Sequence, residues 1–211
     1  MFTPLSEALL YGIVDLGYSD EEQLSAVVRS LIAGGASIIQ LRAKNCEKEQ
    51  ILSWAHQLAP ICKQAGVPFI VNDFIDIAVA VDADGVHLGQ DDGPLSAARE
   101  ALATGKIVGR STHSPEQARA ALAEGADYIG FGPLFPTPTK VGRPGIGIEN
   151  VATIQEEVGS QIPVFCIGGI KRDNLAKVQA AGAKRVVIVS DLLRAPDIEM
   201  ATREVVSQLK S

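Results

Sequence analysis

Charged side chains in this sequence follow short runs of apolar residues, where they could act together on a ligand. The carboxylates are Asp73 and Asp92, and the cations are Arg42, Lys44 and Lys140. Two carboxylates beside several cations suit a bare phosphate poorly. They suit a divalent ion that bridges carboxylates and a diphosphate, because Mg²⁺ takes oxygen ligands from both. This set therefore indicates a magnesium and diphosphate site.

Glycines and hydroxyls indicate a second anion site. The pair Gly168 and Gly169 follows an apolar run, and glycine lets backbone amides approach a phosphate closely. Residues 136–140, PTPTK, place two hydroxyls and an amine around two prolines. Because proline fixes φ and lacks an N–H, this segment is predicted to be a loop. A plain glycine turn and a solvated connection are the alternative interpretations.

Side-chain alternation puts Gln40 and Arg42 on one face of a predicted strand and Ile39 and Leu41 on the other. Two long polar side chains are costly to bury without polar partners, so a ligand is one explanation for them. A lumen ion pair between Arg42 and either Asp73 or Asp92 is the other explanation. The sequence leaves both open.

The histidines differ in their expected roles. His87 is predicted to point inward, where a ligand contact and packing are both open. His113 precedes Ser114 and Pro115, which together look like a helix start, so a structural role is expected for it. His56 lies within a predicted helix and is expected at the surface or in the core. No Ser-His-Asp or Cys-His arrangement stands out in the sequence.

The elements that must position these residues alternate along the chain. Segments of helical periodicity, several of them ending in glycine, separate the β-rich segments. Strict alternation implies parallel strands joined by right-handed crossovers. We therefore predict a single (β/α)8 TIM barrel in one domain over residues 1–211, with a doubly wound sheet as the runner-up. The predicted strands span 9–15, 37–43, 68–73, 85–90, 107–112, 127–132, 163–169 and 185–191.

Composition limits the range of functions. The net charge of −6, without a basic stripe, argues against a nucleic-acid binder. No apolar run approaches the roughly 18 residues that a membrane-spanning helix needs. The three cysteines form no CxxC pair and are expected to be reduced thiols. With no charged secretory opening in the sequence, we expect a cytoplasmic protein.

A set of motifs in this order and spacing resembles the thiamine-phosphate synthase family. The resemblance runs from the first predicted strand to the last and so covers nearly the whole chain. The motifs are QLRAK (40–44), VND (71–73), GVHLGQDD (85–92), GRSTHS (109–114), GFGPLFPTPTK (130–140), IGGI (167–170) and IVS (188–190).

The resemblance implies a TIM-barrel transferase. It would join 4-amino-2-methyl-5-(diphosphooxymethyl)pyrimidine to 4-methyl-5-(2-phosphooxyethyl)thiazole and release pyrophosphate. It implies that Asp73 and Asp92 hold Mg²⁺, that His87 lies near the pyrimidine, and that Arg42, Lys44, Ser111 and Lys140 are catalytic. The implied pyrimidine diphosphate ligands are Gln40, Arg42, Lys44, Asn72, Ser111 and Lys140. The implied thiazole phosphate ligands are Thr137, Thr139, Gly169, Val189 and Ser190.

Two features depart from the family pattern. Phe74 follows VND where the family often has arginine, and residues 141–150 are expected to form a loop that acts as a lid. The rival functions are a TenI-like thiazole tautomerase and a non-catalytic regulator that binds thiazole phosphate. An unrelated sugar-phosphate barrel enzyme is a further rival. Neither a nucleic acid nor a membrane is an expected partner, and a homo-oligomer remains open.

Overall fold

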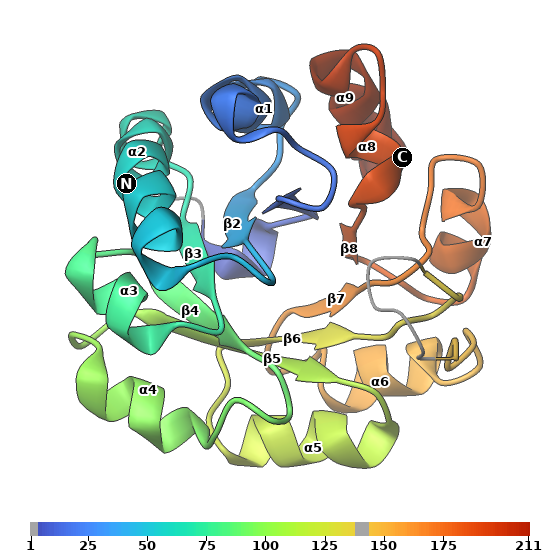
Figure 1. The fold of residues 1–211 in the computed structure, drawn as a ribbon. Helices are drawn as coiled ribbons and strands as arrows, with labels where there is room; N and C mark the ends of the chain where they lie inside the picture. Colours follow the sequence, from blue (N-terminus) through green and yellow to red (C-terminus); the bar gives the residue numbers. More distant parts are fainter. Residues whose placement is uncertain (1–3, 138–143) are drawn as a thin grey trace.

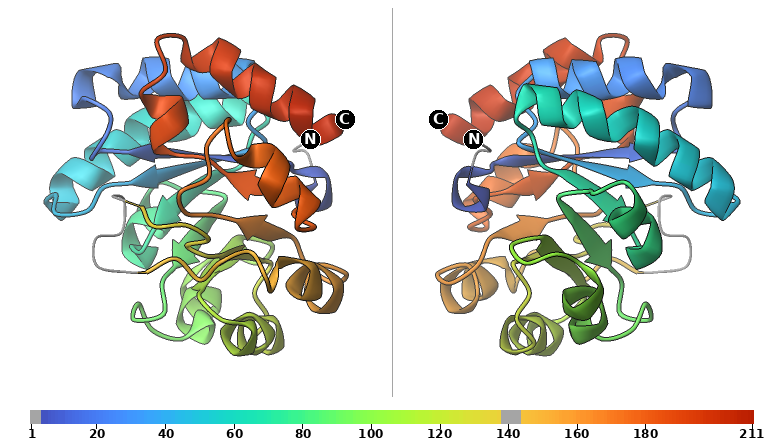
Figure 2. Two further views of the ribbon diagram at one scale, coloured as in Figure 1. Left: turned by 90° about the vertical axis from the view of Figure 1, so that its right-hand side faces the viewer. Right: turned by 90° about the vertical axis from the view of Figure 1, so that its left-hand side faces the viewer.

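The computed structural model describes residues 4–137 and 144–211, and its core is a closed barrel of eight parallel strands in sequence order. Figure 1 looks along this barrel, and Figure 2 shows it from two sides with the helices outside. The predicted (β/α)8 TIM barrel is confirmed. The strands are β1 Leu10–Asp15, β2 Ile38–Arg42, β3 Phe69–Asn72, β4 Gly85–Leu88, β5 Ile107–Thr112, β6 Tyr128–Phe131, β7 Val164–Cys166 and β8 Val186–Val187.

Helices cover the outside of the barrel because each presents an apolar stripe to the strands. The predicted glycine caps are present: Gly66 ends α2 in the left-handed conformation with φ 68°. Ser114 caps α5 by accepting from the Gln117 amide, with Pro115 at the first helical position. The α-helices are α1 Leu24–Ala33, α2 Lys48–Ala65, α3 Ile75–Ala80, α4 Leu95–Ala101, α5 Pro115–Ala123, α6 Val151–Glu157, α7 Leu175–Ala180, α8 Ser190–Leu193 and α9 Ile198–Lys210.

The last two strands are shorter than predicted. Strand β7 ends at Cys166, because Gly168 and Gly169 have φ values of 95° and 64° that no β-ladder accommodates. Strand β8 ends at Val187, and the short helix α8 starts at Ser190. A short extra helix after the eighth strand is a frequent part of phosphate sites in such barrels.

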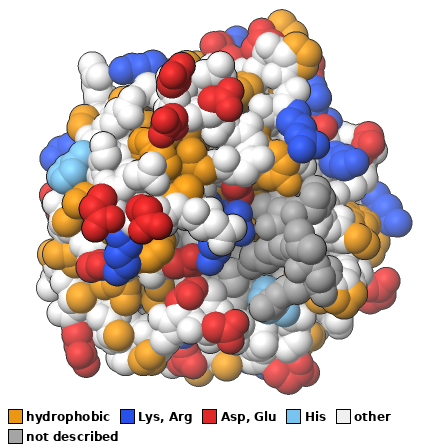
Figure 3. Space-filling view, in the orientation of Figure 1, with side chains coloured by type: hydrophobic (Ala, Val, Ile, Leu, Met, Phe, Trp, Pro, Cys, Tyr) orange, Lys and Arg blue, Asp and Glu red, His pale blue; other side chains and the backbone are white. Residues whose placement is uncertain are grey.

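The remaining surface features agree with the composition. No helix within the described residues is long and apolar enough to cross a membrane. All three cysteines are free thiols, and Cys62 and Cys166 are buried. Figure 3 shows acidic and basic side chains interspersed over the face that it draws in colour, as expected for a chain without a basic stripe.

Candidate active site

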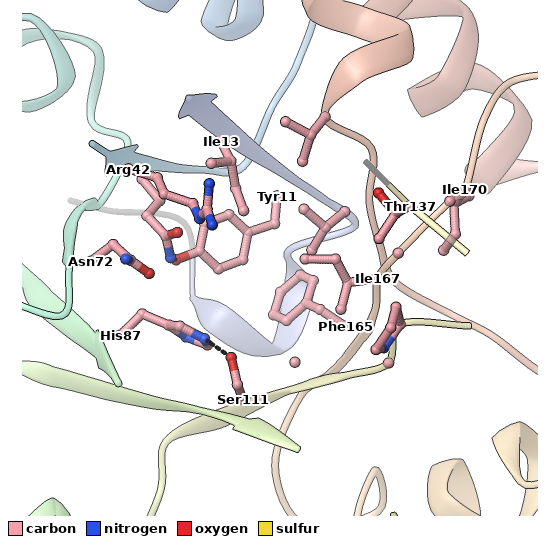
Figure 4. A pocket seen from close by; sticks show the side chains of 18 of the residues that line it. Tyr11, Ile13, Arg42, Asn72, His87, Ser111, Thr137, Phe165, Ile167 and Ile170 are labelled. Atoms are coloured by element: carbon pink, nitrogen blue, oxygen red, sulfur yellow. Dashed lines mark hydrogen bonds between the residues drawn. The ribbon is translucent and has the colours of Figure 1, made fainter. Parts of the chain in front are cut away.

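A pocket opens among the strand ends and gathers most of the residues that were singled out in the sequence (Figure 4). Each strand of the barrel, or the loop that follows that strand, contributes residues to the pocket wall. Polar side chains from β2 to β5 lie on one side, and glycines and hydroxyls from the segments after β6 to β8 lie on the other. The predicted site residues that line it are Gln40, Arg42, Asn72, His87, Ser111, Thr137, Gly169, Val189 and Ser190.

The floor of this pocket is an aromatic cluster that the sequence analysis missed. Tyr11, Tyr128 and Phe165 meet edge to face, with ring centroids 5.4 to 5.7 Å apart. Such contacts fix rings firmly in a core. Burial raises the pKa of both tyrosines, so both are neutral phenols at physiological pH. Alternation along β1 was the available signal, because Tyr11, Ile13 and Asp15 share one face of that strand.

A chain of hydrogen bonds crosses the floor. The Gln40 amide donates to the Tyr11 hydroxyl at 2.8 Å, and the two tyrosine hydroxyls are 2.8 Å apart. His87 Nδ1 lies 3.0 Å from the Tyr128 hydroxyl, and His87 Nε2 lies 2.9 Å from Ser111 Oγ. His87 therefore points into the barrel, as predicted, and connects a buried tyrosine to a serine of the pocket wall.

Arg42 forms an ion pair with a carboxylate that the sequence analysis did not consider. Its guanidinium donates to Asp15, which faces it across the β1–β2 ladder. Both side chains are largely buried, with 12% of Arg42 and 4% of Asp15 exposed. The alternative partners Asp73 and Asp92 were therefore wrong for this pair, because strand register brings Asp15 closer. Arg42 still lines the pocket.

Asp73 and Asp92 lie together at the ends of β3 and β4, outside the pocket lining. Burial raises the pKa of Asp73, and the neighbouring Asp92 carboxyl raises it further, while Lys44, which donates to Asp73, opposes both. The Asp92 carboxylate also accepts from the Gly89 amide at 2.7 Å. Two carboxylates held this close repel each other when both are charged. A hard divalent cation relieves that repulsion, so these residues fit a magnesium ion.

The loop that carries Asp92 is held by Arg110, another residue that the sequence analysis missed. Arg110 is 5% exposed and extends from β5 under this loop. Its guanidinium donates to the Gly89 carbonyl at 2.6 Å and to the Gly93 carbonyl at 2.8 Å. Both ends of the segment around Asp92 are thus fixed by one planar side chain.

The opposite side of the pocket is built from the loops after β6, β7 and β8. The Phe135 amide donates to the Gly168 carbonyl at 3.0 Å, so the start of the Pro-Thr-Pro-Thr-Lys segment lies on the glycine pair. Asn174 donates to the Gly169 carbonyl at 2.9 Å and accepts from the Lys171 amide. A methyl group on Gly169 would approach Phe135 Cβ to 2.7 Å. Only glycine fits this backbone crossing.

The remaining predicted residues have different outcomes. His113 has the expected structural role, because its amide donates to Gln117 and its ring bonds the Gly132 carbonyl, but it also lines the pocket. His56 is exposed on α2. Phe74 packs its ring under Lys48 Nζ, 5.3 Å from the ring centroid. Thr139, Lys140 and the first part of the predicted lid lie outside the described residues.

The fold and the pocket define a (β/α)8 barrel with polar and glycine-rich strand ends, the usual setting for enzymes of phosphorylated substrates. A family model described as thiamine monophosphate synthase matches residues 10–192. The chain belongs to the thiamine monophosphate synthase family.

Individual relatives agree with this family. A thiamine-phosphate synthase of Thermus thermophilus is 46% identical over 187 residues, which are 89% of each chain. One from a Synechocystis strain is 44% identical over 90% of this chain, which spans only 55% of that longer relative. A solved structure described as thiamine phosphate pyrophosphorylase from Pyrococcus furiosus superimposes with a TM-score of 0.87 at 36% identity and covers 99% of this chain and 98% of its own.

These relatives confirm the resemblance drawn from the motifs. They are named as synthases, so they favour a transferase over the tautomerase, the regulator and the unrelated barrel enzyme.

Proposed function

We propose that this protein condenses 4-amino-2-methyl-5-(diphosphooxymethyl)pyrimidine with 4-methyl-5-(2-phosphooxyethyl)thiazole to give thiamine phosphate and pyrophosphate. The observation that carries the proposal is a single pocket with two unlike sides. One side offers Gln40, Arg42 and Ser111, and the other offers glycines with Thr137 and Ser190. Two substrates held on these two sides would meet over the aromatic floor.

On the first side, Arg42 and Asn72 would bind the diphosphate group, with Lys44 beside them. Gln40, His87 and Ser111 would bind the pyrimidine ring, because they line the pocket next to its aromatic floor. Asp73 and Asp92 would hold Mg²⁺, which supplies positive charge to the departing diphosphate when bound. Lys140 is assigned to the same diphosphate by the family resemblance.

On the second side, Gly169, Val189 and Ser190 would bind the phosphate of the thiazole. The support is the left-handed backbone at Gly168 and Gly169, which turns the loop after β7 toward the pocket. Thr137 lines the same side, and Thr139 is assigned to it by the resemblance. The hydroxyls of these residues would orient the thiazole with its ring nitrogen toward the pyrimidine.

The proposed reaction breaks one C–O bond and forms one C–N bond. The electron pair of the C–O bond leaves with the diphosphate, and the electron-rich aminopyrimidine stabilises the positive carbon that remains. The thiazole nitrogen donates its lone pair to that carbon and becomes the thiazolium nitrogen. No proton needs to move. The protein's part is to bind, orient and neutralise charge, and this reaction needs no nucleophile from the protein.

The decisive experiment is incubation of the protein with both substrates and Mg²⁺, followed by chromatographic detection of thiamine phosphate. We expect stoichiometric thiamine phosphate and pyrophosphate, and none when either substrate or the metal is omitted. Conversion of a thiazole tautomer without any coupling to the pyrimidine would instead identify a tautomerase. Binding of thiazole phosphate without any turnover would identify a regulator.

A further inference from the structure

Five polar side chains form a continuous line of hydrogen bonds across the barrel: Gln40, Tyr11, Tyr128, His87 and Ser111. We call this line the lumen relay. The two tyrosine side chains in its middle are buried, so solvent does not supply hydrogen bonds to their hydroxyls. Each hydrogen bond therefore needs one donor and one acceptor from within the relay, because an unpaired buried polar group is costly.

Donor counting allows two arrangements of protons along the relay. A phenol has one proton, and a neutral imidazole has one N–H and one bare nitrogen. If Tyr11 donates to Tyr128, then Tyr128 donates to His87 Nδ1, and His87 carries its proton on Nε2. If Tyr128 donates to Tyr11, then His87 must carry its proton on Nδ1. The two ends of the relay are therefore coupled through the phenols.

The orientation of the Gln40 amide selects between these arrangements. Its Nε2 group faces Tyr11 and donates to the hydroxyl. The Tyr11 proton then has the Tyr128 oxygen as its acceptor, since the Tyr11 hydroxyl contacts Gln40 and Tyr128 within the relay. With the opposite arrangement the Tyr11 proton would have no acceptor in the relay.

We propose that Tyr128 is a positioning residue that holds His87 as the Nε2–H tautomer and thereby makes the Ser111 hydroxyl a hydrogen-bond donor toward the pocket. In this tautomer His87 Nε2 donates to Ser111 Oγ, 2.9 Å away, so the proton of the Ser111 hydroxyl is left to point at a ligand. At the other end, Gln40 uses its amide N–H₂ on Tyr11 and keeps its carbonyl oxygen as an acceptor. Both end residues line the pocket.

The acceptor at Gln40 and the donor at Ser111 match the aminopyrimidine substrate. The biological meaning of this inference rests on the proposed function. An aminopyrimidine offers an N–H₂ donor and ring nitrogens that accept. An acceptor at Gln40 and a donor at Ser111 complement these groups at two separate points. A hydroxypyrimidine ring with its donors and acceptors exchanged would face like groups at both points, which a buried site rejects strongly.

The position of Tyr128 is itself tightly constrained. Gly109 lies opposite Tyr128 in the β5–β6 ladder, and a methyl group on Gly109 would come within 2.1 Å of the tyrosine ring. His87 stacks on the same ring, with centroids 5.5 Å apart and planes inclined by 26°. The hydroxyl of Tyr128 is thus held between Tyr11 and His87 and has little freedom to choose other partners.

The test is the tautomer of His87 in the ligand-free protein, read from nitrogen-15 spectra of uniformly labelled samples. The signals are assigned with His56→Asn and His113→Asn variants. We expect wild-type His87 to carry its proton on Nε2. Tyr128→Phe removes one oxygen and should abolish this preference. Tyr11→Phe is the matched control: it removes the neighbouring phenol oxygen and the link to Gln40. The buried Tyr128 proton then still has His87 Nδ1 as its acceptor in the relay, so the Nε2–H form should persist.

Kinetics provide the second measurement. Tyr128→Phe should lower kcat/KM for the pyrimidine diphosphate at least tenfold while leaving the KM for the thiazole phosphate within twofold. An Nδ1–H tautomer in the wild-type protein, or an unchanged tautomer in Tyr128→Phe, would overturn the proposal. The wild-type spectrum decides even if that variant does not fold. Failure of the proposed function would appear differently, as wild-type protein that makes no thiamine phosphate.

Discussion

At the scale of single residues, the unusual feature is the meeting of Asp73 and Asp92. Asp73 has a left-handed backbone with φ 66°, which is uncommon for a residue other than glycine. Its carboxyl is partly buried and lies beside another carboxyl, so its pKa is raised by burial and by Asp92. A strained backbone and two apposed acids cost stability, and such costs concentrate at functional sites.

Asp92→Asn should separate the metal role from a structural role. Without metal, the change removes the repulsion with Asp73, so we expect the melting temperature to stay equal or rise. With Mg²⁺ at about 100 times its dissociation constant, binding should stabilise the wild type by about 2.7 kcal/mol. For a chain of this size that is a rise of roughly 5–10 °C, which Asp92→Asn should lack. Thermal melts with and without Mg²⁺ measure both effects.

Asp91→Asn is the matched control, because Asp91 is the exposed acidic neighbour of Asp92 in the same loop. It should retain both the Mg²⁺-dependent stabilisation and the turnover. An Asp92→Asn protein that melts well below the wild type in the absence of metal, and responds to Mg²⁺ as before, would show that Asp92 serves the fold and not a metal.

At the scale of elements, loops that carry site residues are fixed by side chains behind them. Arg110 ties the loop after β4 to β5 through two carbonyls. Arg172 ties the loop after β7 to α8 and α9 by donating to Asp191 at 2.9 Å and to Glu204 at 3.2 Å. These contacts place the two sides of the pocket on a rigid barrel, as precise binding requires.

Arg110→Lys should loosen the loop around Asp92 without removing the positive charge. Lysine cannot reach two carbonyls with one planar group, so we expect the Mg²⁺ concentration for half-maximal activity to rise roughly tenfold or more. Arg99→Lys is the control, since Arg99 bridges the Lys106 and Gly125 carbonyls in the same manner away from the pocket. An equal Mg²⁺ requirement in both variants would show that Arg110 does not support the metal site.

Gly169→Ala tests the loop after β7. The added methyl group would lie 2.7 Å from Phe135 Cβ and 2.9 Å from the Pro136 carbonyl, so the backbone crossing must move. Calorimetric titration should show at least tenfold weaker binding of thiazole phosphate, about 1.4 kcal/mol, with nearly normal binding of the pyrimidine diphosphate.

Gly125→Ala is the control for backbone strain. Gly125 also has a positive φ, 84°, but a methyl group there would meet nothing within 4 Å. This variant should lose about 1 kcal/mol of stability and bind both ligands normally. If Gly169→Ala weakens both ligands equally, the loop does not form a separate phosphate site.

At the scale of the whole molecule, the sequence predicted the barrel because helix and strand periodicities alternate so regularly. It also predicted the polar strand ends, since those residues sit at fixed places after each apolar run. It could not predict Asp15 as the partner of Arg42, which depends on the β1–β2 register. Tyr128 and Arg110 were missed because their roles arise from neighbours far away in the sequence.

Barrel closure is weakest where β8 joins its neighbours. Strand β8 pairs with β1 at two positions and with β7 at one. A strand with few inter-strand hydrogen bonds unfolds locally more often than a well-paired one. Peptides covering residues 183–193 should therefore exchange amide hydrogens faster than those covering β5. If thiazole phosphate binds at Gly169, Val189 and Ser190 as proposed, it should slow this exchange and leave β5 unchanged. Equal slowing in both regions, measured by mass spectrometry, would show only general stabilisation.

The two ion pairs at the end of β2 affect which anions the protein binds. Arg42 and Lys44 already have carboxylate partners in Asp15 and Asp73. An inorganic phosphate must therefore compete with a carboxylate for the positive charge of each cation. Under the proposed assignments, a diphosphate arrives with a divalent ion that compensates the displaced Asp73. On these assignments, the two ion pairs favour binding of a diphosphate with its divalent ion over binding of inorganic phosphate.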